Sequence, residues 1–122
     1  MPDPHVETTP NGTTMLRAQD GEVPAEHVDE LDGFKVRFVR RPAQTSYGVE
    51  LSTGFTYMEP GSFEYTFTQD ETLHVIAGRA TVTVDGEREL ALGAGDGIFF
   101  PKGAHTAWVV QEPWRDFFTL VG

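Results

Sequence analysis

The chain contains no cysteine and few basic residues. Without cysteine it has no disulfide framework, no thiolate metal site and no cysteine nucleophile. Nine Lys and Arg residues stand against 19 Asp and Glu residues, which gives a net charge of -10. An acidic field of this size repels phosphate backbones and anionic lipid headgroups. We therefore expect neither nucleic acid nor a membrane surface among the partners.

Long apolar runs are missing as well. No stretch approaches the length of a membrane span, and the first residues lack the basic and apolar regions of a secretory signal. These absences predict a cytoplasmic protein. The 122 residues indicate one domain without a separate cofactor module, and nine Phe, three Tyr and two Trp supply apolar surface for one small core.

Residues 1–33 differ in composition from the rest of the chain. They hold eight of the 19 acidic residues and a single basic one, Arg17, and they contain no aromatic residue. Turn-forming Pro and Gly are frequent there. We predict an extended acidic N-terminal arm over 1–33 that contributes little to the core. The segment 24–31 predicts a short helix in this arm, because Pro24 falls near the first turn and carboxylates follow early.

From Phe34 onward, short alternating apolar segments are separated by Gly or Pro, which is typical of an all-β sandwich or barrel. We therefore predict one barrel domain over 34–122. The clearest hairpin joins 81–84 to 87–90, because Asp85-Gly86 supplies the positive φ angles of a two-residue turn. The other strands are predicted near 34–39, 47–58, 63–68, 71–77, 98–100, 106–110 and 115–121.

Two spacings in the barrel segment carry family information. Six residues separate Glu71 from Gly78, and five separate Gly95 from Pro101-Lys-Gly103. In this frame the sequence resembles the two-motif pattern of the cupin superfamily. The resemblance implies an all-β cupin-type β-barrel, that is, a double-stranded β-helix or jelly roll. It also implies a homodimer, which would protect the exposed sheet edge.

The metal-ligand positions of the cupin pattern are altered in this chain. They fall on Tyr65, Phe67, Glu71 and Thr106, of which only one is a strong ligand. We therefore expect no metal and no other cofactor. Together with Pro60-Gly-Ser-Phe63 and Pro101-Lys-Gly103, this substitution is similar to the ureidoglycine aminohydrolase-type branch of small cupins. That branch takes its name from a metal-using member, so the name does not carry an activity to this chain.

Strand alternation predicts which side chains share the barrel interior. Tyr65 and Phe67 share one strand face, and Thr106 and Trp108 share another. Glu71 begins a third apolar face, so it is expected to be a lone carboxylate among aromatic rings. Burial of this kind raises the pKa of a carboxyl and suits it to proton transfer.

The favoured interpretation is a small-molecule-binding cupin of unassigned activity, with metal-independent acid–base chemistry at Glu71. Small organic ligands would be held in the barrel mouth. One alternative is a metal-dependent cupin enzyme that uses Glu71 and His105, although His105 is one residue out of frame and needs a bulge to reach the cavity. The other is a non-catalytic structural or regulatory barrel filled by its own side chains. The candidate catalytic residue is Glu71, and the candidate ligand-binding residues are Tyr57, Tyr65, Phe67, His105, Thr106 and Trp108.

Overall fold

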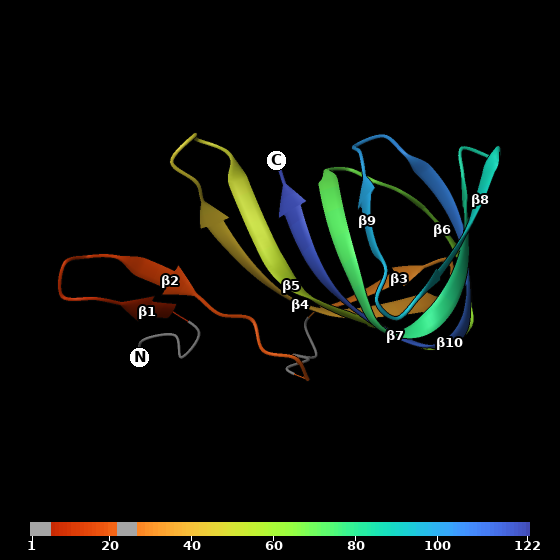
Figure 1. Cartoon of the computed structure of the whole chain (residues 1–122), viewed down its shortest axis with the longest axis horizontal. Coiled ribbons are helices and arrows are strands. Elements are labelled where there is room, and N and C mark those ends of the chain that lie inside the picture. Colours follow the sequence, from red (N-terminus) through yellow and green to blue (C-terminus); the bar gives the residue numbers. More distant parts are fainter. Residues whose placement is uncertain (1–5, 22–26) are drawn as a thin grey trace.

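The computed structural model describes residues 6–21 and 27–122, and these residues form ten antiparallel strands (Figure 1). No helix long and apolar enough to cross a membrane occurs within these two ranges. The strands are β1 Val6–Thr8, β2 Thr14–Leu16, β3 Val28–Leu31, β4 Phe34–Gln44, β5 Glu50–Met58, β6 Gly61–Thr66, β7 Asp70–Val84, β8 Arg88–Gly93, β9 Gly97–Phe100 and β10 His105–Val121.

Two long strands, β7 and β10, run through both halves of the barrel (Figure 1). They pair with each other along most of their length. The C-terminal part of β10 also pairs with β5, and its N-terminal part pairs with β6. In the same way β7 pairs with β9 near its start and with β8 near its end. Two curved sheets result, with a shared pair of strands, and the predicted all-β barrel is confirmed.

The register between β7 and β10 shifts where the two strands bend together, between Val110 and Asp116. Gly78 lies at this bend with a φ of +98°, a conformation that favours glycine. A Cβ atom there would lie 2.4 Å from the Pro113 carbonyl oxygen and 2.8 Å from Trp114 Cα. Glycine at this position therefore allows the backbones of the two paired strands to approach each other closely at the bend.

Aromatic and aliphatic side chains fill the space between the sheets. Phe67 stacks on Phe100 with ring centroids 4.6 Å apart, and the Trp114 ring meets Trp108 edge-on at 5.5 Å. Such pairs stabilise a core beyond the burial of their apolar area. The most deeply buried members of the core include Val75, Val82, Ala80, Phe100, Val110 and Trp114.

The predicted turn at Asp85-Gly86 is confirmed. Both residues have positive φ angles, 53° and 69°, and the Glu87 amide donates to the Val84 carbonyl at 3.0 Å. The predicted strands 71–77 and 81–84 are parts of one strand, β7, and 106–110 and 115–121 are parts of β10. Cross-strand partners continue through the bends, so these residues belong to single long strands.

The short helix predicted over 24–31 is wrong for its described part. Residues 24–26 lie outside the described residues, and 28–31 form β3, an edge strand that pairs with β4. The reason is a second Asp-Gly turn. Asp32 and Gly33 have φ angles of 52° and 85°, which close a hairpin between Leu31 and Phe34. Sheet pairing at this turn outweighs the weak helical signal.

The strands β1 and β2 form a separate two-stranded sheet beside the barrel (Figure 1). Arg17 and Glu7 form an ion pair across this hairpin. The chain returns to the barrel at Asp20, which accepts a hydrogen bond from the Tyr57 hydroxyl at 2.8 Å and pairs with Arg115 at 3.2 Å. Contacts of the arm with the outside of the barrel are therefore polar at this point.

Candidate functional site

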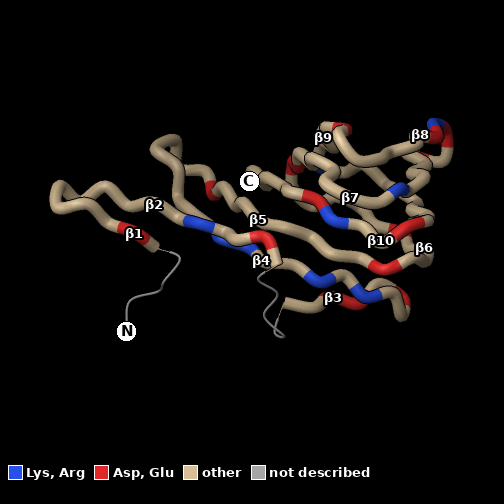
Figure 2. Tube along the Cα trace, turned by 60° about the horizontal axis from the view of Figure 1, so that its bottom comes forward, with Lys and Arg blue, Asp and Glu red and all other residues tan. Residues whose placement is uncertain are grey.

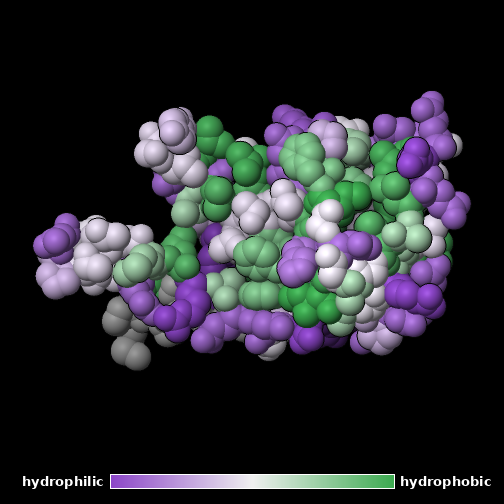
Figure 3. Space-filling view, viewed as in Figure 1, coloured by the Kyte–Doolittle hydropathy of each residue, from purple (hydrophilic) through white to green (hydrophobic). Residues whose placement is uncertain are grey.

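A cavity of about 300 Å³ opens between the two sheets and is lined by the inner faces of β3 to β7 and β10. Hydrophobic residues show at the barrel surface in Figure 3, among hydrophilic residues toward its edges. Aromatic rings supply much of the cavity wall: Phe38, Phe63, Tyr65, Phe67, Trp108 and Phe118.

Strand alternation places the predicted inner residues on this wall. On β6 and just beyond it, Phe63, Tyr65 and Phe67 project to the same side, and all three line the cavity. Glu71 on β7 and Trp108 on β10 line it as well. The structure therefore brings together four of the residues singled out by the sequence pattern, namely Tyr65, Phe67, Glu71 and Trp108.

A second carboxyl group shares the cavity with Glu71. Asp116 on β10 lines the same wall and is only 2% exposed. Its Oδ2 accepts a hydrogen bond from Trp114 Nε1 at 2.6 Å. Its Oδ1 has no hydrogen-bond partner within the described part of the chain. The expectation that Glu71 is a lone carboxylate is therefore wrong, because the buried Asp116 and the exposed Asp29 line the same cavity.

Burial raises the pKa of both acids toward neutral pH. For Glu71 the pKa rises to about 8, first because burial disfavours the charged form and second because of the negative charge of Asp116. For Asp116 burial raises the pKa to about 7, although hydrogen bonding by the Trp114 and Thr56 side chains opposes the rise. The pair therefore gains and loses protons in the physiological pH range.

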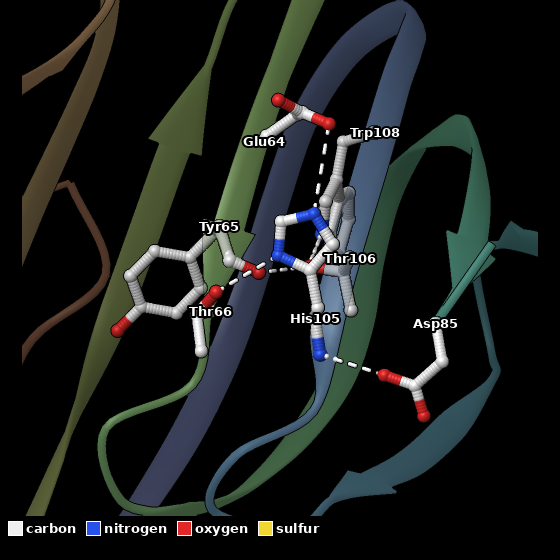
Figure 4. Close-up of polar contacts among 7 residues, drawn as sticks. All are labelled: Glu64, Tyr65, Thr66, Asp85, His105, Thr106 and Trp108. Atoms are coloured by element: carbon white, nitrogen blue, oxygen red, sulfur yellow. Dashed lines mark hydrogen bonds and ion pairs between the residues drawn. The ribbon is translucent and has the colours of Figure 1, made fainter.

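Thr106 supports the wall and lies behind it. This residue is fully buried, and its hydroxyl donates to the Tyr65 carbonyl at 2.6 Å (Figure 4). The same oxygen accepts a hydrogen bond from Trp108 Nε1 at 3.0 Å. Thr106 is not among the residues that line the cavity. Its expected contact with a ligand is replaced by a role in fixing Trp108, because both hydroxyl functions are already in use.

His105 points away from the cavity, in contrast to the arrangement that a metal site would need. Its ring lies near Thr66, with Nδ1 2.9 Å from Oγ1, and near Glu64, with Nε2 3.6 Å from Oε1 (Figure 4). Residues 105–110 pair with β6 without a register shift, so no bulge turns the ring inward. About half of the side chain is exposed.

Tyr57 also lies apart from the cavity. It sits on the outer face of β5, where its hydroxyl accepts a hydrogen bond from the Gly21 amide at 2.5 Å and donates to Asp20. Burial under this segment raises the pKa of the phenol. Tyr57 alternates with Thr56 and Met58, which line the cavity, so its side chain faces the other way.

The cupin metal positions do not fit a metal ion in this structure. Phe67 has no donor atom, and the Thr106 oxygen is committed to Tyr65 and Trp108. Among residues 6–21 and 27–122, no group of three or more His, Asp or Glu side chains is placed to hold a metal. A first-row divalent ion needs several converging donors, and the carboxyls on the cavity wall do not converge in this way within the described residues.

Comparison with known proteins gives a family and a fold. The family model described as the EutQ-like cupin domain matches residues 48–117. The structure of the EutQ protein from Clostridium difficile is similar, with 21% identity, a TM-score of 0.68 and coverage of 94% of this chain and 91% of that chain. The putative ethanolamine utilization protein Q from Salmonella typhimurium LT2 has 20% identity, a TM-score of 0.66 and coverage of 94% and 90%.

A protein of the DUF861 family from Thermotoga maritima is also similar. Its identity is 29%, its TM-score is 0.53, and the match covers 54% of this chain and 75% of that chain. No curated protein matches the chain. These findings support the resemblance to cupins, and the narrower resemblance to the ureidoglycine aminohydrolase-type branch stays a prediction.

Proposed function

Since the chain belongs to the EutQ-like cupin domain family, we propose that it binds a small organic molecule in the barrel cavity and exchanges protons with it through Glu71 and Asp116. The supporting observation is that a buried carboxyl, Asp116, and a partly buried one, Glu71, line one aromatic cavity and both have raised pKa values. The cupin fold alone does not indicate an activity, because unrelated reactions occur on it.

The carboxyl pair has the protonation behaviour that acid–base chemistry needs. A general acid or base works best when its pKa lies near the operating pH. Glu71 and Asp116 meet this condition, and their mutual repulsion favours the state in which the pair keeps at least one proton. In that state one carboxyl donates a proton and the other accepts one, without a metal ion.

The remainder of the cavity is suited to holding an organic molecule. Rings such as Phe67 and Trp108 supply apolar contact area. Polar side chains on the wall, among them Arg40, Tyr65 and Gln69, can orient a ligand. A volume of about 300 Å³ is at the lower end of the usual range for small-molecule sites.

The two other interpretations receive less support. A metal-dependent enzyme built on Glu71 and His105 would need both groups in one place, but His105 contacts Glu64 and Thr66. A barrel filled by its own side chains would leave no space inside, but this barrel contains a cavity lined by Glu71 and Asp116.

Fragment binding tests the proposal, with tryptophan fluorescence and NMR as the readouts. Trp108 lines the cavity and Trp114 lies against it, so both tryptophans of the chain report occupancy. We expect saturable binding of neutral or charged fragments of about ten heavy atoms, with an affinity that changes between pH 6 and pH 9. The change should be absent in the double variant Glu71→Gln/Asp116→Asn.

Two substitutions show whether the fragments enter the barrel. Val36→Phe fills the cavity wall and should abolish binding. Val109→Phe is the matched control, because Val109 is 47% exposed outside the barrel, and binding should persist there. The proposal fails if no fragment binds, or if binding survives Val36→Phe.

A further inference from the structure

Within the described part of the chain, Glu71 and Asp116 have no cationic partner. None of the ion pairs formed within residues 6–21 and 27–122 involves Glu71 or Asp116. Buried carboxylates are usually paired with a cation or held by several hydrogen bonds. Asp116 lines the cavity, and its Oδ1 is enclosed without a hydrogen-bond partner among the described residues.

An unpartnered buried acceptor favours ligands that donate hydrogen bonds. Asp116 Oδ2 accepts a hydrogen bond from Trp114, whereas Oδ1 is buried without a partner in the described residues. Leaving such a group unsatisfied is unfavourable, because it loses its hydration without gaining a hydrogen bond. A ligand N–H group would satisfy it, and a ligand carboxylate would add a third negative charge.

The other charged and titratable groups on the wall make the cavity acidic. Asp29 from β3, Glu71 from β7 and Asp116 from β10 are carboxyls, and Tyr65 from β6 is a phenol whose pKa burial raises. The basic group on the wall is Arg40, from the strand on which four of the nine basic residues lie (Figure 2).

Arg40 does not neutralise the deep acids. Its Nε donates to Ser52 Oγ at 2.9 Å, and its Nη2 pairs with Glu50 Oε1 at 3.0 Å. Burial and the Asp116 charge account for the raised pKa of Glu71, with no lowering by Arg40. The inner end of the cavity therefore has excess negative charge whenever the acids ionise.

Aromatic rings around the acids also favour positive charge. Tyr65, Phe67 and Trp108 line the cavity with Glu71, and aromatic π-systems attract ammonium groups. Carboxyl groups and aromatic rings together can replace the water molecules that an ammonium group loses when it enters the cavity.

We propose that the ligand of this cavity carries a protonated amine, which binds between Glu71 and Asp116 with its apolar part against the aromatic wall. This inference rests on the proposed function, because it concerns the same cavity. The ammonium group would supply a cation to the two acids, which form no ion pair within the described residues.

Proton release follows from this arrangement. The acids of the empty cavity hold protons near neutral pH because burial raises their pKa values. An ammonium group favours the ionised carboxylate, so each binding event sends a proton from the pair into solution. While one proton is released, affinity should rise about tenfold for each pH unit.

Calorimetric titration with three probes tests this inference: benzylamine, its neutral analogue benzyl alcohol, and benzoate. At pH 7.5 we expect benzylamine to bind at least tenfold more tightly than benzyl alcohol, with benzoate weakest. Titrations in two buffers of different ionisation enthalpy should show release of close to one proton per benzylamine bound.

Variants locate the effect and keep the inference separable from the proposed function. Glu71→Gln and Asp116→Asn should each reduce the preference for benzylamine at least fivefold, and either is informative if the other does not fold. Glu64→Gln, which alters an exposed carboxylate outside the cavity, should leave the preference unchanged. If benzyl alcohol binds as tightly as benzylamine, the amine inference is wrong and the cavity proposal survives. If none of the three probes binds, both are contradicted.

Discussion

At the scale of single residues, Glu71 and Asp116 lie in a barrel interior that disfavours their charged forms, whereas water favours them. Their ordinary pKa values are 4.5 and 3.8, and burial in the barrel raises the pKa of Glu71 to about 8 and that of Asp116 to about 7. The folded protein therefore binds more protons than the unfolded chain between about pH 4 and pH 8. Stability linked to these acids is greatest at the acidic side of this window and is lost as the pH rises through it.

We predict that the free energy of unfolding falls between pH 5 and pH 9 by an amount on the order of a few kcal/mol, since one pKa unit corresponds to about 1.4 kcal/mol. The double variant Glu71→Gln/Asp116→Asn should flatten this dependence and be the more stable protein at pH 9. Urea unfolding at several pH values measures both effects.

Glu89→Gln is the control for this prediction. Glu89 is an exposed acid on β8, so its removal should leave the slope of stability against pH unchanged. An unaltered slope in the double variant would show that other groups cause the pH dependence.

Sequence reasoning could reach Glu71 but did not reach Asp116. The cupin frame and strand alternation single out Glu71. Asp116 stands outside both motifs. Its position two residues before Phe118 and four before Leu120 places it on the same strand face, and this alternation was the pattern that could have predicted an inward side chain. His105 and Tyr57 show the converse limit, because a side chain that is chemically apt can still belong to the outer face.

At the scale of elements, the close packing of β7 against β10 at their shared bend holds the two sheets together. Gly78→Ala places a methyl group within 3 Å of Pro113 and Trp114 backbone atoms at a φ of +98°. We predict a loss of about 3 kcal/mol or more in unfolding free energy, because neither backbone can move aside without breaking pairing.

Gly97→Ala tests whether the loss of stability is specific to the bend shared by β7 and β10. A Cβ atom at Gly97 would meet only the Leu73 carbonyl oxygen, at an unstrained 3.9 Å. Chemical denaturation should place this variant within about 1 kcal/mol of the natural protein. Equal losses of unfolding free energy in Gly78→Ala and Gly97→Ala would contradict the close approach of β7 and β10 at Gly78.

Most strands could be predicted because alternation and turn residues agree along 34–122. The Asp85-Gly86 hairpin followed directly from turn chemistry. The same chemistry at Asp32-Gly33 was outweighed in the prediction by the helical signal before it, which is why β3 was missed. The continuity of β7 and β10 through their bends depends on long-range pairing that local patterns do not contain.

At the scale of the whole molecule, the β1–β2 hairpin forms a sheet of its own and is not stabilised by pairing with the barrel strands that the structure describes. Among residues 6–21 and 27–122 it pairs with no barrel strand, and Val6 and Met15 are 36% and 44% exposed. An isolated two-stranded hairpin is marginally stable in water. The barrel also exposes Phe117 and Val121 on its outer face.

We predict that a second copy of the chain covers the hairpin, so that the protein is a homodimer in solution. Light scattering coupled to gel filtration should give about twice the chain mass of 13.5 kDa. Removal of residues 1–17 should shift the mass to that of one chain, with circular dichroism confirming that the β-barrel persists. A full-length chain that elutes as a monomer at micromolar concentration contradicts this prediction.

The protonation of the cavity acids is the central claim, and carboxyl ¹³C NMR tests it most directly. Two side-chain carboxyl signals should titrate with apparent pKa values near 8 and 7, far above the ordinary values of 4.5 and 3.8. Glu71→Gln and Asp116→Asn should each remove one of these signals and lower the apparent pKa of the remaining acid if their charges interact. Titration of both carboxyls near pH 4 would contradict the account.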